Sequence, residues 1–353
     1  MKIGIFHATL PSAGRKLGGV EVFVHRLASA LVSAKCDVEV ISLTEPPPEA
    51  VYKHRQLFQR FPSLKNNQML RLGLLPALLN FSGFGRYDVV HLHGDDWFYV
   101  ARNIATVRTF HGSAIFESRS AKTLKRKLAQ RMVYPLERFA GLLADVVLAV
   151  GTEASRIYHA DGVDKPLVSA LQFHPGEKTP EPSFVFVGLW KGRKRGEFVA
   201  ERFSNEILPN LPDAKLYMAC DFVPKAKGIV DLNHPSDAVL AKTIREAWAL
   251  LSASTYEGFG IPYLEAISSG TVVVTTPNSG AEYVLENGKY GLIVPDERYS
   301  ETVLKIARDR ALRQNYESLA LSRAADFSEN QVIAEHIAFY RAAIEKKRHG
   351  RRA

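Results

Sequence analysis

Short runs of apolar and β-branched residues alternate along the chain with longer segments of helical periodicity. The first half contains such runs at residues 2–7, 37–43, 88–92, 104–110 and 145–150. The second half contains them at residues 184–187, 214–219, 247–252, 271–275 and 291–294. Several runs lack the apolar–polar alternation of a strand with one face in water, which is typical of strands buried on both faces. The pattern therefore predicts two parallel sheets, each covered by helices.

A stretch rich in proline and glutamate, FHPGEKTPEPS at residues 173–183, separates the two sets of runs. The length of 353 residues also exceeds what one hydrophobic core usually serves. We therefore predict an α/β fold of two facing, Rossmann-like, doubly wound domains with a cleft between them. The first domain is expected at residues 1–174 and the second at 182–328, and a C-terminal helix at about 329–353 is expected to pack back on the first.

The composition is consistent with this two-domain fold and bears on disulfides, secretion and membrane insertion. Cys36 and Cys220 are the two cysteines of the chain, too few for a disulfide framework or a thiolate metal site. The N-terminal residues lack the pattern of a signal peptide. The apolar segment at residues 72–81 is shorter than a spanning helix and contains Pro76. These features predict a cytoplasmic protein that does not cross a membrane.

The net charge of +9 is unevenly distributed along the chain. The segment from Ser118 to Leu136 contains no acidic residue, and a second basic group, EKKRHGRRA, ends the sequence. Such a distribution favours anionic partners, whether phosphates, a membrane surface or nucleic acid. The basic residues of the first group are Arg119, Lys122, Lys125, Arg126, Lys127 and Arg131.

The first basic segment also carries apolar residues at near-helical spacing. They are Leu124, Leu128, Met132, Leu136 and Phe139. A basic amphipathic helix of this kind can lie on anionic lipid or hold a phosphorylated ligand. Alternatively, the apolar stripe packs against the core of its domain. Pro135 is expected to break the helix.

The stretch DVVHLHGDDWF at residues 88–98 has the order H-x-H-x-D-D, one letter from a dinuclear-zinc pattern. A zinc hydrolase needs further His or Asp ligands at later strand ends. His111 and His174 are present, but neither lies in a recognisable ligand motif, and Asp96 replaces the expected histidine. We therefore predict no metal site here, and we interpret His91 as a packed histidine at the tip of a strand.

The stretch STYEGFGIPYLEAISSG at residues 254–270 carries the strongest chemical signal. Pro262 suits the first turn of a helix and Gly270 suits its end. Ligands of doubly wound sheets bind beyond the carboxyl ends of strands, and this segment follows a predicted strand. The helix N-terminus offers amides to an anion, while Glu257 and Glu265, eight positions apart, could reach the hydroxyls of the same ligand.

This segment resembles the E-x7-E signature of retaining GT-B glycosyltransferases, particularly those of family 4. The resemblance extends to LGGVEVFVHRLASAL at residues 17–31, to DVVHLHG and TFHG at two strand ends, and to residues 270–295. It implies transfer of a sugar from a nucleotide diphosphate donor, with retention of anomeric configuration and without a metal or other cofactor. We expect the donor to be a UDP- or GDP-hexose. The expected acceptor is a glycolipid or an intermediate of polysaccharide or lipopolysaccharide biosynthesis, which would bring the protein to the inner face of a membrane.

The resemblance also implies roles for single residues. Glu257 would hold hydroxyls of the donor sugar, and Glu265 would hold the ribose. His111 matches a histidine at the reacting sugar, where it could orient the donor or stabilise developing positive charge. The other predicted donor contacts are Gly18, Gly19, Gly258, Phe259, Gly260 and Ile261. Asp95 and Asp96 either contact acceptor hydroxyls or serve as a helix cap or solvated loop.

The loop VFVGLWKGRKRGEF at residues 185–198 is predicted to neutralise the departing diphosphate, because fixed cations lower the barrier to its release. The family has an arginine directly after the strand-end glycine, and Leu189 stands at that position here. Arg193, Lys194 and Arg195 are the replacements that the sequence offers, and which two face the diphosphate stays open.

Two other functions are compatible with parts of the sequence. A nucleotide-sugar epimerase or hydrolase could share the fold and the donor contacts. A nucleic-acid-binding protein would explain the pI of about 9.4, but the chain lacks the signatures of the common nucleic-acid-binding modules, and we expect no nucleic-acid partner.

Overall fold

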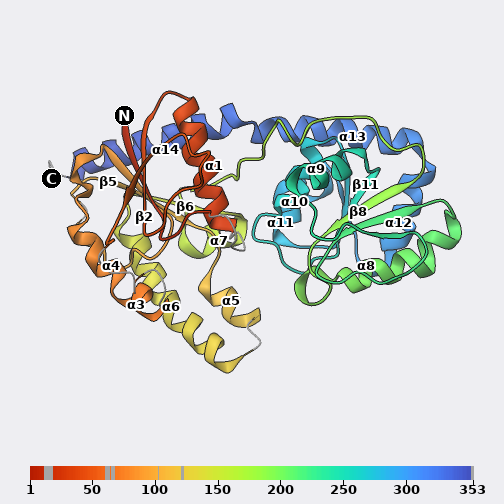
Figure 1. Cartoon of the computed structure of the whole chain (residues 1–353), viewed down its shortest axis with the longest axis horizontal. Coiled ribbons are helices and arrows are strands. Elements are labelled where there is room, and N and C mark those ends of the chain that lie inside the picture. The colour runs from red at the N-terminus through yellow and green to blue at the C-terminus, as the bar shows by residue number, and fades with distance from the viewer. Residues whose placement is uncertain (12–18, 60–63, 65–67, 102, 121–122, 351–353) are drawn as a thin grey trace. The chain divides into compact units, whose positions relative to one another are not determined.

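The computed structural model describes residues 1–11, 19–59, 64, 68–101, 103–120 and 123–350. The chain divides into two compact units, each with its own sheet (Figure 1). The first unit consists of Met1–Leu167 together with Glu329–Ala353, and the second of Val168–Ser328. The boundaries expected from the sequence, at residues 174 and 182, lie somewhat later in the chain.

The sheet of the first unit has seven parallel strands among the described residues, in the order β3-β2-β1-β4-β5-β6-β7. Its central strands are buried on both faces, as the continuous apolar runs predicted. The strands are β1 (Lys2–Phe6), β2 (Asp37–Ser42), β3 (Lys53–Gln56), β4 (Val89–Leu92), β5 (Ala105–Phe110), β6 (Val146–Ala149) and β7 (Gly162–Val163).

The first unit also contains α-helices. They are α1 (Gly19–Ser33), α3 (Gln68–Gly73), α4 (Leu75–Leu78), α5 (Ala114–Ser120), α6 (Leu124–Leu143), α7 (Thr152–Tyr158) and α14 (Glu329–Gly350). Helix α6 continues through Pro135, so the predicted break at this residue is wrong. Proline removes one backbone hydrogen bond but does not by itself end a helix that other contacts support.

The second sheet has six parallel strands among the described residues, in the order β10-β9-β8-β11-β12-β13. The prediction of two parallel-sheet, Rossmann-like units is thereby confirmed. The strands are β8 (Ser183–Val187), β9 (Lys215–Ala219), β10 (Ile229–Asp231), β11 (Ala249–Leu251), β12 (Val272–Thr275) and β13 (Leu292–Ile293). The helices are α8 (Gly196–Arg202), α9 (Asp237–Glu246), α10 (Ile261–Ser268), α11 (Ser279–Val284), α12 (Tyr299–Arg308) and α13 (Arg310–Ala324).

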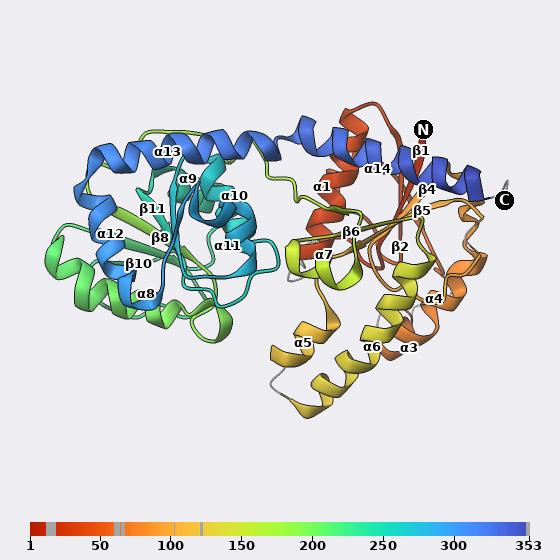
Figure 2. The same cartoon turned by 180° about the vertical axis from the view of Figure 1, so that it is seen from behind.

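Helix α14 returns to the first unit and packs on strands β4, β5 and β6 (Figure 2). Its apolar face joins the core of that unit through Val332, Ile333, Tyr340 and Ala343. The helix also makes buried hydrogen bonds, through His336 and Tyr340. His336 donates from Nδ1 to the carbonyl of Val332 and from Nε2 to Oδ1 of Asp164, each at 2.8 Å. Both ring nitrogens therefore carry hydrogen, and His336 is an imidazolium paired with the Asp164 carboxylate.

The other carboxylate oxygen of Asp164 continues the chain of hydrogen bonds into the sheet. It accepts from the hydroxyl of Thr109, whose only hydrogen is thereby used. Nε2 of His91 must then donate to Thr109 Oγ1 at 2.7 Å, and Nδ1 of His91 accepts from the Tyr340 hydroxyl at 3.0 Å. Each buried polar group in this chain has a partner, and the chain joins α14 to β4 and β5.

We expect His336→Leu to destabilise the protein strongly, because it leaves the charge of Asp164 buried without its partner. Loss of one member of a buried ion pair typically costs about 3–5 kcal/mol. Urea titration of both variants would measure the effect, with His349→Leu, at the exposed end of the same helix, as the control. A cost for His336→Leu as small as that of the control would contradict the assigned pairing.

The same pair predicts how stability depends on pH. Burial alone would lower the pKa of His336, but the charge of Asp164 outweighs burial and raises it above 6.5. Burial alone would raise the pKa of Asp164, but His336 and Thr109 hold it below 3.8. The stabilisation of the folded state by His336 is therefore complete below pH 6.5, and it is lost as the pH rises through the raised pKa of His336 in the folded protein. The Asp164 contribution is present above pH 3.8 and is lost as the pH falls through its lowered folded pKa. The difference in free energy of unfolding between the wild type and His336→Leu should therefore shrink at both the acidic and the alkaline end of the pH range.

Candidate functional site

Glu257 lies in the loop between β11 and α10, and its side chain is buried, at 5% exposure. Its Oε1 accepts from Lys194 Nζ at 2.5 Å and from Ser254 Oγ at 2.7 Å. Its Oε2 accepts from Arg193 Nη1 at 3.0 Å. Strands β8 and β11 are neighbours in the sheet, so the loops beyond their carboxyl ends meet. The fold thus brings the predicted carboxylate together with two of the predicted cations.

The charge of Glu257 is stable in this setting. Burial alone would raise the pKa of this carboxyl group. The charge and hydrogen bond of Lys194, the hydrogen bond of Ser254 and the charge of Arg193 outweigh burial and hold the pKa below 4.5. Glu257 is therefore ionised at neutral pH and acts only as a hydrogen-bond acceptor.

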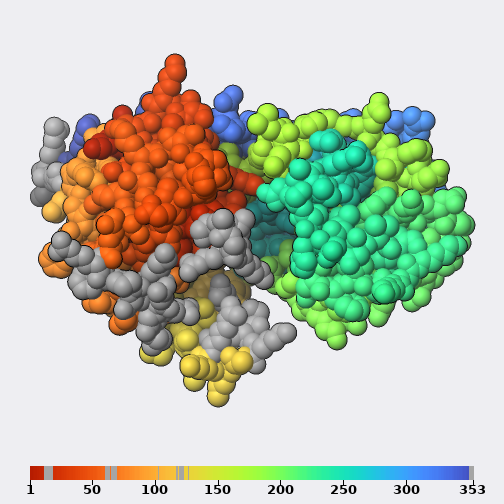
Figure 3. Space-filling view, viewed as in Figure 1, coloured from red at the N-terminus to blue at the C-terminus, as the bar shows by residue number. Residues whose placement is uncertain are grey.

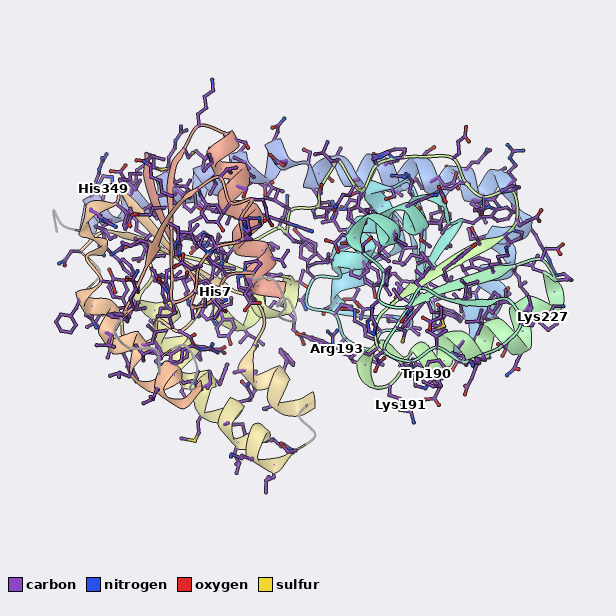
Figure 4. All side chains as sticks on the ribbon, viewed as in Figure 1. His7, Trp190, Lys191, Arg193, Lys227 and His349 are labelled. Carbon is purple, nitrogen blue, oxygen red and sulfur yellow. The ribbon has the colours of Figure 1, made fainter. Side chains whose placement is uncertain are left out.

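Arg195 has a different partner from its two basic neighbours. Its guanidinium forms two hydrogen bonds with the carboxylate of Asp296, at 3.0 and 2.5 Å, and lies 4.2 Å from the centre of the Phe198 ring. Its backbone has a positive φ of 54° at the start of α8. Arg193, labelled in Figure 4, donates to the carbonyl of Tyr256 at 2.7 Å in addition to its contact with Glu257. The structure therefore pairs Arg193 and Lys194 with Glu257, and Arg195 with Asp296.

The glycine-rich turn before α10 leaves open space at one glycine and none at the other. A Cβ added to Gly258 would meet no atom within 4 Å. Gly260 has a φ of 89° and caps the helix, and a Cβ there would lie 2.3 Å from the Tyr263 ring. Phe259 is buried against Tyr283 and Phe327, while Ile261 is exposed at the first turn. Space for a ligand is therefore found at Gly258.

Glu265 lies in the second turn of α10 and is partly buried. It is on the same helix that follows Glu257, as the spacing predicted. This residue already has a partner within the protein.

Residues beyond the predicted set hold the Glu257 loop in place. Asn278 caps α11 and donates to the carbonyl of Ser254 at 3.2 Å, and the hydroxyl of Ser279 donates to the carbonyl of Glu257 at 3.1 Å. A Cβ on Gly280 would lie 2.7 Å from the carbonyl oxygen of Phe259. These residues were not among those predicted from the sequence, although Asn278 before a short helix is a recognisable N-cap.

The first unit has a cavity of about 830 Å³ at the carboxyl ends of β4 and β5. His93, Asp95, Arg108 and His111 contribute to its lining from the strand ends. Helix α6 contributes a second wall, from Lys125, Ala129, Gln130, Val133 and Glu137. The predicted His111 and Asp95 therefore lie in one cavity.

The two adjacent aspartates of this region have different environments. Asp95 has a positive φ of 53°, and its carboxylate lies 3.4 Å from Arg71 Nε. Burial raises its pKa, and Arg71 opposes this shift. Asp96 is fully buried and pairs with Arg108 Nε at 2.7 Å. Asp95 thus lines the cavity, whereas Asp96 is paired with the buried Arg108.

The predicted glycine loop is only partly described, because Gly18 lies outside the described residues. Gly19 is exposed and begins α1. The next residues of this helix reach the same cavity as His111. Val20 lines the cavity, and the Phe23 ring packs edge-on against His111 at 4.9 Å between centroids.

Helix α6 carries its apolar stripe on the surface rather than against the core. Leu124, Met132 and Leu142 are 72%, 74% and 81% exposed, and Leu128 and Phe139 are also exposed. In the space-filling view, the yellow side chains of this region stand at the margin of the first unit (Figure 3). Lys127, Arg131 and Arg138 flank the stripe. Among the described residues, no helix is long and apolar enough to cross a membrane.

The H-x-H-x-D-D motif forms part of the only group among the described residues that could hold a metal. Ligand atoms of His91, His93 and Asp164 lie within 4.8 Å of one another. Both nitrogens of His91 and both oxygens of Asp164 are already hydrogen-bonded within the protein. Nδ1 of His93 is bonded to His111. A cation would have to displace these bonds, so the residues fit the hydrogen-bonded chain better than a metal.

Two family models match the chain. The model described as Glycosyltransferase Family 4 matches residues 17–169, and the model described as Glycosyl transferases group 1 matches residues 231–323. Together they include the cavity of the first unit and the Glu257 loop of the second.

Similar proteins include a phosphatidyl-myo-inositol mannosyltransferase of Mycolicibacterium smegmatis, 24% identical over 92% of this chain and 90% of the relative. A poly(glycerol-phosphate) alpha-glucosyltransferase of Bacillus subtilis is 26% identical over 54% of this chain, and the match spans 30% of that relative's length. Among solved structures, sucrose-phosphate synthase from Thermosynechococcus elongatus has a TM-score of 0.70 at 16% identity, covering 96% of this chain and 98% of that structure. WaaG, a glycosyltransferase involved in lipopolysaccharide biosynthesis, has a TM-score of 0.63 at 15% identity, covering 95% and 98%. These structures share the two-sheet fold.

We expect the protein to contain no stoichiometric zinc. Elemental analysis of the purified full chain should find less than one equivalent, and EDTA should leave its thermal midpoint unchanged, because the His91 and Asp164 atoms are satisfied by protein partners. One zinc per chain, removed by EDTA with a fall in thermal midpoint, would instead assign the metal to His91, His93 and Asp164.

Proposed function

Because the chain belongs to glycosyltransferase family 4 and has the GT-B fold, we propose that it transfers a hexose from a UDP- or GDP-sugar to a lipid-linked saccharide or polysaccharide intermediate. The proposed transfer retains the anomeric configuration, as the family resemblance implies. The observation that carries the proposal is the contact of buried Glu257 with Lys194 and Arg193 at the carboxyl end of the second sheet.

The donor is assigned to the second unit. A nucleotide sugar has a diphosphate that needs cations and hydroxyls that need acceptors, and this cluster contains both kinds of group. Glu257, held ionised, accepts hydrogen bonds from hydroxyls of the donor sugar. Lys194 and Arg193 neutralise the diphosphate and stabilise the charge that grows on its oxygens as the glycosidic bond breaks. Arg193 thereby takes the place of the arginine that Leu189 replaces.

The turn before α10 supplies the remaining donor contacts. The open space at Gly258 admits the sugar or diphosphate to the amides of residues 258–261, at the positive end of the helix dipole. Glu265, in the second turn of α10, accepts hydrogen bonds from the ribose. Gly19, at the start of α1, allows close approach to the donor phosphates or to the acceptor.

The acceptor is assigned to the cavity of the first unit. Asp95 lies in this cavity and can accept a hydrogen bond from an acceptor hydroxyl. His111 orients the donor sugar or stabilises positive charge at its reacting carbon. The departing diphosphate accepts the proton of the attacking hydroxyl, so that attack and departure occur on the same face of the sugar. No metal or cofactor is part of this proposal.

The lipid-linked acceptor is supported by the two faces of α6. One face lines the cavity with Lys125, Gln130 and Glu137, and the other exposes Leu124, Leu128 and Met132. An exposed apolar stripe flanked by basic residues is typical of helices that lie on anionic membranes. The relative named phosphatidyl-myo-inositol mannosyltransferase has a lipid in its printed name. We therefore place the chain at a membrane surface as a peripheral protein.

Truncation of the loop cations tests the donor assignment. We expect Lys194→Ala and Arg193→Ala each to lower turnover about a hundredfold to a thousandfold, the usual cost of removing one preorganised electrostatic donor. Release of UDP from UDP-glucose, or of GDP from GDP-mannose, measures turnover. Product analysis with and without added acceptor lipid separates transfer from hydrolysis or epimerisation.

Two further variants serve as comparisons for the turnover of Lys194→Ala and Arg193→Ala. Arg202→Ala removes the ion pair between Arg202, at the end of α8, and Glu206. This variant is the control for loss of a cation and should keep wild-type turnover. Arg195→Ala should lower the thermal midpoint clearly while leaving turnover close to that of the wild type, because Arg195 pairs with Asp296. Wild-type turnover in both Lys194→Ala and Arg193→Ala would overturn the donor assignment.

Charge on the exposed stripe tests the membrane assignment. We expect the double variant Leu128→Glu/Met132→Glu to lose binding to vesicles that contain phosphatidylglycerol, because carboxylates there oppose burial and repel the anionic surface. Vesicle flotation measures binding. Val51→Glu, also at an exposed apolar residue of the first unit, is the control. Equal flotation of both variants and the wild type would contradict a role for α6.

A further inference from the structure

His111 has a buried neighbour, His93, which was considered from the sequence only as part of the H-x-H-x-D-D motif. His93 follows β4 directly and is 2% exposed. Its Nδ1 lies 2.8 Å from Nε2 of His111, which follows the neighbouring strand β5. The carbonyl of His93 accepts a hydrogen bond from Nδ1 of His7 at 2.9 Å, and the Phe23 ring packs against both His93 and His111. The two imidazoles are therefore held in a fixed relation.

Both imidazoles are neutral. Burial lowers the pKa of His111 to about 3, although Asp164 opposes this shift. Burial, and then the neighbouring histidines, lower the pKa of His93 well below its ordinary value. Each ring therefore carries one hydrogen, and the short contact between Nδ1 of His93 and Nε2 of His111 requires that one of these two atoms donates and the other accepts.

The burial of His93 decides between the two arrangements. Its Nε2 is inaccessible to water and has no hydrogen-bond partner. If His111 donated, the hydrogen of His93 would sit on this Nε2 and form an orphaned, buried N–H group, which is rare in folded proteins. If His93 donates from Nδ1, only a bare nitrogen is left at Nε2. The second arrangement is favoured, and the hydrogen of His111 is then on Nδ1.

We propose that His93 is a positioning residue that holds His111 in the tautomer protonated at Nδ1, so that His111 offers an N–H donor to a substrate oxygen. This inference rests on the proposed function, because it takes His111 as a residue that contacts the reacting sugar. The bound oxygen is a hydroxyl, ring or phosphate oxygen of the nucleotide sugar. In the other tautomer the same nitrogen would be an acceptor and would repel a ring or phosphate oxygen.

The tautomer can be measured without substrate. The full chain is labelled with ¹⁵N-histidine, and the ring nitrogens are observed by NMR at neutral pH, with the His111→Gln variant assigning the His111 signals. We expect a protonated Nδ1 and a bare Nε2 for His111 in the wild type. In His93→Leu, which removes the donor but keeps an apolar side chain, we expect a mixture of the two tautomers.

Kinetics test whether the tautomer matters for turnover. We expect His93→Leu to lower kcat by up to about a hundredfold, comparable with misplacement of a group in an active site. The thermal shift produced by UDP or GDP should stay as in the wild type. His93→Asn keeps an amide N–H at the position of Nδ1 and should recover most of kcat together with the wild-type tautomer. A purely structural role would not produce this joint recovery.

The outcomes separate the inference from the function on which it rests. Protonation of His111 at Nε2 in the wild type, or unchanged kcat in His93→Leu despite mixed tautomers, would overturn the inference. Unchanged kcat in His111→Gln would instead overturn the role proposed for His111, whatever the tautomer measurement shows. A fixed Nδ1–H tautomer that is lost with kcat in His93→Leu and regained with kcat in His93→Asn supports both.

Discussion

Carboxylates removed from water have to be paired with cations, and such pairs hold both candidate sites of this protein in place. Asp164 binds the imidazolium of His336, Asp96 binds Arg108, and Glu257 binds Lys194 and Arg193. Each pair joins segments that are distant in the sequence or at least on different strands. Because an unpaired buried charge is strongly unfavourable, each pair restricts its segments to one arrangement. The Asp164 pair fixes α14, and the Glu257 pair fixes the loops after β8 and β11.

The parallel sheets explain why these pairs lie beside open binding surfaces. All strands of each described sheet run in the same direction, so the loops after neighbouring strands gather at one edge. In the first unit this edge combines His93 with His111, from β4 and β5. In the second unit it combines Lys194 with Glu257, from the loops after β8 and β11. Buried hydrogen bonds behind the edge orient the groups that line it, which is the relation that we propose between His93 and His111.

The basic loop shows how the structure selects among neighbouring cations of similar sequence. Leu189, where the family resemblance leads us to expect an arginine, is half exposed. Arg193, four residues later, reaches Glu257 and the carbonyl of Tyr256. The long side chain of Arg193 thus brings a guanidinium to this carboxylate from the loop after β8. Charge at the site, rather than identity at one position, is what the proposed chemistry needs.

The sequence by itself determined the two parallel sheets and the positions of most of their strands, because strands buried on both faces must be apolar throughout. It also determined the Glu257 loop and its helix, whose glycine and proline positions are local requirements. It missed β3, β7 and β10, which are short edge strands that exist through pairing with a neighbour. Only the tertiary structure decided that Arg193 and Lys194, not Arg195, contact Glu257, that the α6 stripe is exposed, and that His93 bonds to His111. Contacts between segments far apart in sequence depend on packing, and no local pattern encodes them.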